Sequence, residues 1–242
     1  MPKSDKHWKI FGESNPYFGV LSDAKFKSDA LNDDALSEFF ETGRLEVKDA
    51  LEKFRSAFGE PQRGSCLDFG CGVGRNMLHL ADNFRKVVAV DVSPGMLREA
   101  EANARKTGRN NVAFRQTIGD DGFDFIYSNI VLQHIHPAEG LGLLRTLLGS
   151  VINNGGGMVQ LIFRMPPKLE RLNRRMDAMP WLWGFRNLRM GRKFNHPRMA
   201  TYAYPLDDVL GLFVEAGIPS LFSEFTNHSD HIGLKIYFRK PG

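Results

Sequence analysis

The sequence predicts one α/β domain: a mostly parallel sheet of seven strands with helices on both faces. Short apolar runs of strand length alternate with longer helical patterns, and a glycine-rich turn joins the first strand to the first core helix. Core strands are expected at 65–69, 86–90, 112–116, 123–128 and 158–163. Core helices are expected between them, at 74–83, 94–106 and 137–151.

Helix and turn signals place several boundaries. Ser93 followed by Pro94 is typical of an N-cap and a first helical position. The sequence Asn154-Gly155-Gly156-Gly157 predicts a loop before the fifth strand. After the core, the pattern predicts a helix at 205–216 and closing strands at 220–225 and 233–239.

Four segments divide the predicted domain. Residues 1–60 carry apolar residues at helical spacings from 36 to 58, with a break expected at Gly43, so they are predicted to form a helical cap. Residues 61–163 form the core, 164–204 an irregular insertion, and 205–242 the remainder of the same domain. At 242 residues, the chain needs only one substantial core.

The most informative motif is Leu67-Asp68-Phe69-Gly70-Cys71-Gly72-Val73-Gly74-Arg75, followed by Asp91 after the second strand. Alternate glycines let the backbone turn sharply and approach a ligand closely. A dinucleotide fingerprint would require a third glycine at position 75, which is arginine here. A carboxylate at Asp68 also repels phosphate, so the turn favours a ligand with a cationic group.

Three motifs in order resemble the class I S-adenosylmethionine-dependent methyltransferases. The first is the 68–74 turn, the second is Asp91 with the 93–97 segment, and the third is 123–129 with the apolar segment that follows it. The resemblance covers residues 61–163 well and the last forty residues loosely, and it implies a Rossmann-like methyltransferase fold with S-adenosyl-L-methionine as cofactor.

The resemblance and the chemistry of the ligand assign roles to residues at the strand ends. Asp68 is expected near the methionine amino group, Arg75 near its carboxylate, and Asp91 at the ribose hydroxyls. The glycine turn is expected to let the backbone approach the cofactor closely. The adenine is expected to lie between apolar and hydroxyl side chains. The remaining cofactor-binding candidates are Gly70, Cys71, Gly72, Gly74, Val92, Met96, Thr117, Ser128, Asn129 and Ile130.

His134, just past the fourth strand, is the candidate general base, because an alcohol acceptor benefits from proton removal and histidine titrates near neutrality. The cluster His228-Ser229-Asp230-His231 lacks a fourth ligand at a recognisable spacing, so no metal is expected.

The insertion is strongly basic. Residues 164–198 contain ten Lys and Arg but only Glu170 and Asp177 as acids, although the whole chain has a formal net charge of only +4. Five methionines and two tryptophans lie in 164–204. Such a segment is typical of a lid over an anionic acceptor, a nucleic-acid or membrane surface, or a merely solvated face. The substrate-binding candidates are Tyr17, Trp181, Trp183, Arg175, His228 and His231.

Composition restricts the setting. The N-terminus lacks the apolar core of a signal peptide and no 18-residue apolar run occurs, which favours a cytoplasmic protein without a membrane span. The two cysteines, Cys66 and Cys71, are too few for a disulfide scaffold, and a bond between them would distort the turn.

The expected function is methyl transfer to a small-molecule acceptor, at oxygen in preference to nitrogen, with an anionic or glycosyl-type substrate favoured by the basic lid. Two alternatives remain open. The protein could methylate RNA with the 164–198 segment against phosphates, although no separate RNA-binding module is visible. It could instead bind the cofactor without turnover. The oligomeric state is not predicted.

Overall fold

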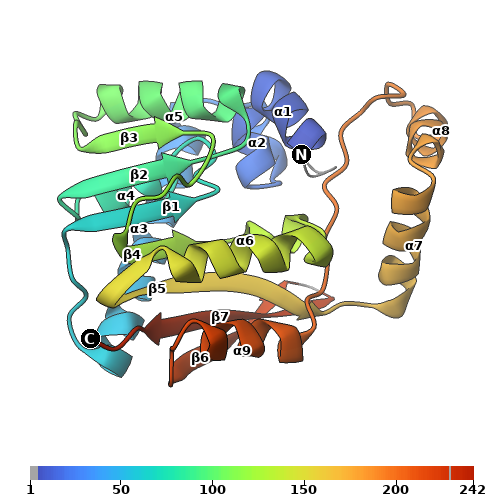
Figure 1. Cartoon of the computed structure of the whole chain (residues 1–242). Helices are drawn as coiled ribbons and strands as arrows, with labels where there is room; N and C mark the ends of the chain where they lie inside the picture. The colour runs from blue at the N-terminus through green and yellow to red at the C-terminus, as the bar shows by residue number, and fades with distance from the viewer. Residues whose placement is uncertain (1–4, 229) are drawn as a thin grey trace.

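The computed structural model describes residues 5–228 and 230–242, apart from the side chain of His228. Seven strands form one sheet in the order β3-β2-β1-β4-β5-β7-β6 (Figure 1). Strand β7 is antiparallel to both of its neighbours, and the other pairings are parallel. The strands are β1 Ser65–Phe69, β2 Lys86–Val90, β3 Val112–Arg115, β4 Phe123–Ser128, β5 Val151–Arg164, β6 Leu221–His228 and β7 His231–Arg239.

Helices cover both faces of the sheet and extend beyond it at one end, where α7 and α8 stand apart from the core (Figure 1). The helices are α1 Asp5–Ser14, α2 Pro16–Val20, η1 Ala24–Phe26, α3 Asp33–Phe58, α4 Met77–Ala81, α5 Pro94–Lys106, η2 Leu132–His134, α6 Pro137–Gly149, α7 Pro167–Ala178, α8 Trp181–Arg189 and α9 Leu206–Glu215. In the described part of the chain, no helix combines the length and apolar character required to cross a bilayer.

Successive residues of the core strands point to opposite faces of the sheet, and both faces are buried. Leu67 and Ile126 face a cluster completed by α6 and α9. Cys66 and Phe125 face the opposite cluster, which α3, α4 and α5 complete. Burial on both sides explains why these strands read as continuous apolar runs.

The predicted core strands and helices are present, and the Ser93 cap is confirmed. The Ser93 side chain accepts a hydrogen bond from Met96 N, with Pro94 in the first turn of α5. Cys66 and Cys71 are both buried free thiols. The predicted closing strands form one edge of the sheet, where β7 lies between β5 and β6 and pairs antiparallel with both.

The break predicted at Gly43 is wrong, because α3 runs through it without interruption. The residue serves a close approach instead: a Cβ on Gly43 would lie 2.0 Å from the carbonyl oxygen of Arg75. The glycine therefore lets α3 pack directly against the turn after β1.

The loop predicted at 154–157 is also wrong, because β5 begins at Val151 and includes these residues. The pairing with β4 shifts register between Phe123 and Phe125, and Asn154 adopts a φ of 63° within this bulge. A Cβ on Gly156 would meet the Phe54 ring at 2.7 Å, and one on Gly157 would meet Ile126 Cγ1 at 2.5 Å. Because these two glycines have no side chain, the Phe54 ring and Ile126 can pack directly against the β5 backbone.

The predicted cap divides into two parts. Helices α1, α2 and η1 pack with the start of α3 in an aromatic cluster that includes Phe11, Phe26 and Phe39. The second half of α3 contributes Leu51 and Phe54 to the sheet face. Helix α3 therefore belongs to both parts: its start packs with the cap, and its second half covers the sheet.

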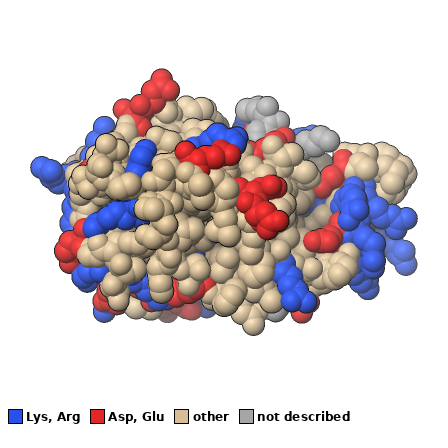
Figure 2. All heavy atoms as spheres, turned by 60° about the horizontal axis from the view of Figure 1, so that its bottom comes forward, with Lys and Arg blue, Asp and Glu red and all other residues tan. Residues whose placement is uncertain are grey.

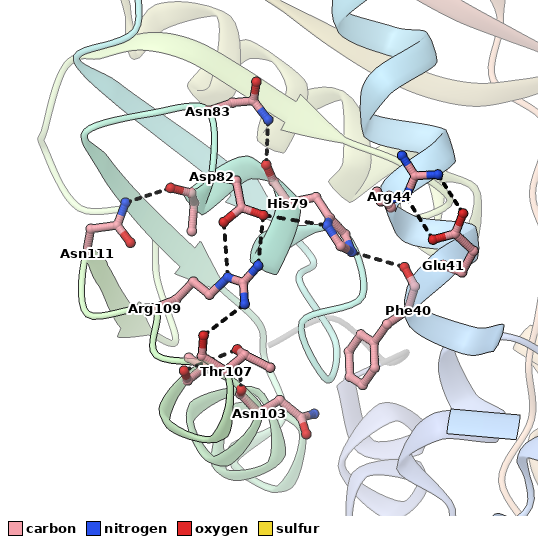
Figure 3. A network of polar contacts seen from close by, with 12 residues as sticks. Phe40, Glu41, Arg44, His79, Asp82, Asn83, Asn103, Thr107, Arg109 and Asn111 are labelled. Carbon is pink, nitrogen blue, oxygen red and sulfur yellow. Dashed lines mark hydrogen bonds and ion pairs between the residues drawn. The ribbon is translucent and has the colours of Figure 1, made fainter. Parts of the chain in front are cut away.

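Short polar contacts secure α4 behind the turn (Figure 3). His79 Nε2 lies 3.0 Å from the carbonyl oxygen of Phe40 in α3. Asp82, at the end of α4, pairs with Arg109 in the loop before β3, with N···O distances of 3.1 and 2.9 Å. These contacts hold α4, and with it the end of the glycine turn, between α3 and the sheet.

Candidate cofactor site and its relatives

The glycine turn lies at the carboxyl end of β1, where the sheet order reverses between β2 and β4. This is the position at which open α/β sheets bind ligands. Gly70, Gly72 and Gly74 have φ values of 77°, 54° and 90°, which residues with side chains rarely adopt. The backbone N–H groups of Gly70 and Cys71 both donate to Val90 O, tying the turn to β2.

Asp91 follows β2 and its carboxylate is held in place by backbone groups. Gly72 N donates to Asp91 Oδ2 at 3.0 Å, and Ser93 N donates to Oδ1 at 2.9 Å. Burial raises the pKa of Asp91 to about 6 despite these two bonds. Each carboxylate oxygen keeps a second lone pair, so the oriented group can accept hydroxyl donors from a diol.

Asp68 and Arg75 form the buried charged part of the site. Asp68 is 3% exposed and Arg75 is 5% exposed. Burial raises the pKa of Asp68 to about 7, while the Arg75 charge opposes the rise. Arg75 Nη1 donates to Thr42 Oγ1 at 3.3 Å, which anchors the guanidinium to α3. Asp68 Oδ2 has no hydrogen-bond partner in the described chain.

The end of β4 contributes further buried polar atoms without partners. Ser128 Oγ and both amide atoms of Asn129 lack hydrogen bonds within the described residues. Native proteins satisfy nearly all such groups with protein, water or ligand partners, so several at one end of the sheet fit a site for a polar ligand. Ile130 has a φ of 61°, which is strained for a β-branched residue. Its N–H donates to Gln160 Oε1 at 2.7 Å.

The cap closes over this edge of the sheet. A Cβ on Gly72 would lie 2.5 Å from Val20 Cγ2 of α2, and one on Gly12 would lie 2.1 Å from Ser93 Oγ. Both glycines therefore permit direct contact between the cap and the segments that carry Asp91. The site is consequently enclosed by the glycine turn, the 91–93 segment and the N-terminal helices.

Comparison with known proteins agrees with this geometry. A family model described as "Methyltransferase domain" matches residues 66–156. An uncharacterised methyltransferase of Staphylococcus carnosus is 30% identical over 95 residues, covering 38% of this chain and 44% of that protein. The release factor glutamine methyltransferase of Bacillus subtilis is 40% identical over 82 residues, which is 33% of this chain and 28% of the relative. The chain therefore spans less than half of the length of these two curated relatives.

Solved structures share the complete fold. The magnesium protoporphyrin IX methyltransferase of Synechocystis, crystallised with S-adenosylmethionine, has a TM-score of 0.63 at 14% identity, covering 99% of this chain and 98% of that one. Residues 66–156 therefore resemble the methyltransferase domain family, and the whole chain has the fold of an S-adenosylmethionine-dependent methyltransferase. A second similar structure is the 1,6-didemethyltoxoflavin-N1-methyltransferase of Burkholderia thailandensis, with a TM-score of 0.54, 18% identity and 86% coverage of both chains.

The remaining cofactor candidates lie in different settings. Val92 is partly buried beside Asp91, and its carbonyl accepts from Gln116 Nε2 at 3.3 Å. Thr117 is exposed beyond β3. Met96 is 2% exposed and packs in the aromatic cluster of the cap. Cys71 is buried, and burial raises the pKa of its thiol.

His134 lies at the border between the cap, β4 and the insertion. Its Nδ1 is 2.7 Å from the carbonyl oxygen of Ala200, so Nδ1 carries the proton. The Trp8 ring packs edge-on against it, with centroids 5.1 Å apart. Burial lowers the pKa of His134 to about 4, which makes the neutral imidazole a weak base. The proposed catalytic role therefore stays a prediction.

Tyr17 and Trp183 both make polar contacts within the protein, and their expected binding of substrate stays a prediction. Tyr17 is buried, and its hydroxyl exchanges hydrogen bonds with Asn103 of α5 at 3.0–3.2 Å. Trp183 Nε1 donates to His196 O at 2.8 Å inside the insertion. Both polar atoms are satisfied within the protein, so these side chains join elements together.

Other predicted substrate residues are exposed or lie at the same edge of the sheet. Trp181 and Arg175 are exposed on α8 and α7. His231 begins β7, at the hairpin tip beside the end of β5, while the side chain of His228 lies outside the described part of the chain. Among the residues described, no group of three potential metal ligands converges.

Two residues of the site are missed by sequence reasoning. Gln160 is 1% exposed on β5, and its side-chain oxygen orients the strained Ile130 backbone. The sequence offers one signal for this role, a single glutamine within an otherwise apolar strand. Trp8 packs against His134 across a distance of more than 120 residues in sequence, and no local pattern predicts that contact.

Proposed function

We propose that this protein binds S-adenosyl-L-methionine and transfers its methyl group to a small-molecule acceptor. The supporting observation is the set of buried polar atoms without partners at the ends of β1 and β4, beside a glycine turn and an oriented Asp91. These groups match an ammonium, a carboxylate and a ribose diol in one ligand. The methyltransferase-domain match and the structural neighbour crystallised with S-adenosylmethionine support the same cofactor.

Each residue has a role that its contacts support. The Asp68 carboxylate attracts the methionine ammonium, and the Arg75 guanidinium, anchored by Thr42, attracts its carboxylate. Asp91 accepts the ribose hydroxyls with lone pairs that the backbone leaves free. Gly70, Gly72 and Gly74 supply the positive φ values that bring the turn beside these groups.

The cofactor supplies an activated methyl group on a sulfonium, and the protein supplies position. Displacement at the methyl carbon is in line, and the neutral thioether leaves without an acid. Holding donor and acceptor in near-attack geometry therefore provides most of the acceleration. Ser128, Asn129 and the 130–134 segment border the side from which an acceptor would enter.

We further propose an acceptor oxygen that ionises without assistance, such as a carboxylate or an acidic hydroxyl. A neutral sugar hydroxyl would require a base near pKa 7, whereas burial lowers the pKa of His134 to about 4. The exposed cations of the 164–198 segment favour an anionic acceptor. Structural relatives are named for porphyrin and toxoflavin substrates, which are small molecules.

Calorimetric titration of the purified chain with S-adenosylhomocysteine tests the cofactor site. We expect binding by the wild type and a loss of about tenfold or more in Asp91→Ala, because two hydroxyl contacts are removed. Asp120→Ala is the matched control, since Asp120 is an exposed acid outside the site. Equal affinity of the Asp91 variant, or no binding by the wild type, would contradict the proposal.

Turnover is measured as S-adenosylhomocysteine formation with a panel of acceptors. We expect product with carboxylate or acidic hydroxyl acceptors and none with the corresponding esters or ethers, which have no ionisable oxygen. Formation of S-adenosylhomocysteine at the same rate without any acceptor would indicate slow hydrolysis of the cofactor and would contradict methyl transfer to an acceptor. Methylation confined to amines would contradict the oxygen preference alone.

A further inference from the structure

Helix α8 presents an apolar face to solvent. Trp181, Phe185 and Leu188 are 54%, 59% and 54% exposed. Their spacing of i, i+4 and i+7 places them on one side of the helix. The Trp181 and Phe185 rings pack edge-on at 5.9 Å, and Phe185 continues to Phe194 at 5.7 Å. Large apolar groups that cluster on a surface mark a contact with another body.

An adjacent side of α8 is occupied by the return segment of the insertion. Asn187 is fully buried and donates to the carbonyl oxygens of Phe194 and His196. A Cβ on Gly184 would lie 2.2 Å from the Phe194 ring. The 190–196 return segment is therefore packed against α8. The face formed by Trp181, Phe185 and Leu188 remains exposed outside this small core.

The insertion that carries this face is rich in cations without matching acids. Nine are exposed, and within the described chain none of the nine forms an ion pair: Arg164, Lys168, Arg171, Arg174, Arg175, Arg186, Arg189, Arg192 and Lys193. Asp177 is engaged by Arg198 at 2.7 Å, which leaves Glu170 as the other acid of the segment. Figure 2 shows the basic side chains gathered at the end of the molecule that carries α7 and α8.

We propose that α8 docks on the surface of an anionic lipid bilayer. A helix with exposed Trp, Phe and Leu on one side and Arg and Lys around it is suited to lie at the headgroup level, with its apolar side in the acyl boundary. Anionic headgroups complement the unpaired cations. The Trp181 and Phe185 rings fit the interface of a bilayer, and the aliphatic Leu188 beside them fits acyl chains but has no planar surface for base stacking, which favours lipid over RNA.

The docking surface connects to the candidate site through the chain that returns from α8. Tyr202 N donates to Gln133 O at 2.7 Å, and His134 bonds to Ala200 O. A docked α8 would therefore hold the acceptor side of the site near the bilayer. The docking itself is independent of the proposed methyl transfer, so each can fail without the other.

Vesicle co-sedimentation of the full chain tests the proposal. We expect binding to phosphatidylcholine vesicles that contain phosphatidylglycerol, weaker binding as salt rises, and none to phosphatidylcholine alone. Trp181→Ser with Phe185→Ser, and separately Arg186→Gln with Arg189→Gln, should each lower the partition coefficient about tenfold or more. Val214→Ser and Arg105→Gln are the controls, because both residues are exposed away from the insertion and should leave binding unchanged.

A second measurement on the wild type keeps the test independent of variant folding. Brominated lipid should quench tryptophan fluorescence in anionic vesicles, since Trp181 would enter the interface. Absence of vesicle binding would overturn the proposal, as would binding that the α8 variants retain while folded. Salt-sensitive binding to RNA without vesicle binding, or a dimer that dissociates in the Trp181/Phe185 variant, would assign the face to a different partner and overturn it equally.

Discussion

At the residue scale, burial keeps the charged groups of the candidate site in an unfavourable state that a ligand can relieve. Asp68 is enclosed with one oxygen unsatisfied, and desolvation raises its pKa to about 7. An ammonium placed beside it would stabilise the carboxylate and lower that pKa again. The free protein is therefore poised to gain interaction energy from a cationic ligand.

The titration of Asp68 predicts a pH-dependent affinity. Because the ligand prefers the ionised carboxylate, its affinity should rise with pH up to about 7 and then level, and binding below pH 7 should release a proton. Asp91, with a pKa of about 6, contributes in the same direction. Calorimetry in buffers of different ionisation enthalpy measures the released proton.

Asp68→Asn provides the matched comparison for this titration. The amide keeps the shape of the side chain but has no charge, so affinity for S-adenosylhomocysteine should fall about ten- to hundredfold at pH 7.5. The proton release between pH 6 and 7.5 should also decrease. A variant that retains the full pH dependence would show that another group carries it.

Substitutions of His134 can distinguish a positioning role from general-base catalysis. Its protonated Nδ1 bonds to Ala200 O, and asparagine can offer an N–H at a similar position. If this contact matters, His134→Ala should reduce kcat/KM about tenfold and His134→Asn less than about threefold. A base would instead lose about 10²–10⁴-fold in both variants, with an ionisation removed from the pH–rate profile.

At the element scale, glycines determine how closely helices and strands approach. Gly43 brings α3 against the Arg75 carbonyl, and Gly12 brings α1 against Ser93. Because these glycines have no side chain, α1 of the cap and α3 can pack directly against the glycine turn and the segment after Asp91. Long-range contacts, and not helix propensity, explain why glycine is present at these helical positions.

Gly43→Ala should therefore destabilise the protein although alanine is the better helix former. Its Cβ would displace the Arg75 backbone, at a cost of about 1–3 kcal/mol, and weaken cofactor binding through Arg75. Gly142→Ala is the matched control, because this exposed glycine of α6 has no heavy atom within 4 Å of an added Cβ. The control should gain up to about 1 kcal/mol in urea unfolding. Stabilisation by both substitutions would contradict the close approach.

At the scale of the whole molecule, the N-terminal helices and the insertion meet over one edge of the sheet. Trp8 packs on His134, and Ser22 Oγ lies 3.1 Å from Met199 Sδ at the end of the insertion. Arg198 N donates to His7 Nδ1 at 3.3 Å. These contacts join parts of the chain almost 200 residues apart, so the N-terminal helices and the insertion share one boundary.

Cofactor binding should consequently protect the cap as well as the turn. With S-adenosylhomocysteine, hydrogen exchange should slow in residues 70–76 and also in 8–20, because α1 and α2 lie on the segments that hold the ligand. Helix α9, which covers the other face of the sheet, should be unaffected. Protection of the turn alone would show that the cap moves independently of the site.

Much of the fold and the cofactor motif could be predicted from local pattern. The buried strands are apolar runs, Ser93 and Pro94 begin a helix, and Asp68, the glycines and Asp91 occupy consecutive strand ends. Each of these signals depends on neighbours within a few residues, so the sequence displays it directly. The carboxyl ends of parallel strands meet at one edge, which brings the distant members together.

Other features depend on contacts between distant segments. Gly43 and Gly156 read locally as a helix break and a loop, yet they admit an Arg75 carbonyl and a Phe54 ring. Tyr17 reads as a substrate contact but bonds to Asn103, and Gln160 gains its role only when β5 lies beside β4. Burial and steric exclusion act between surfaces that only the folded chain brings together, and they decided which of these residues serve the site and which hold it in shape.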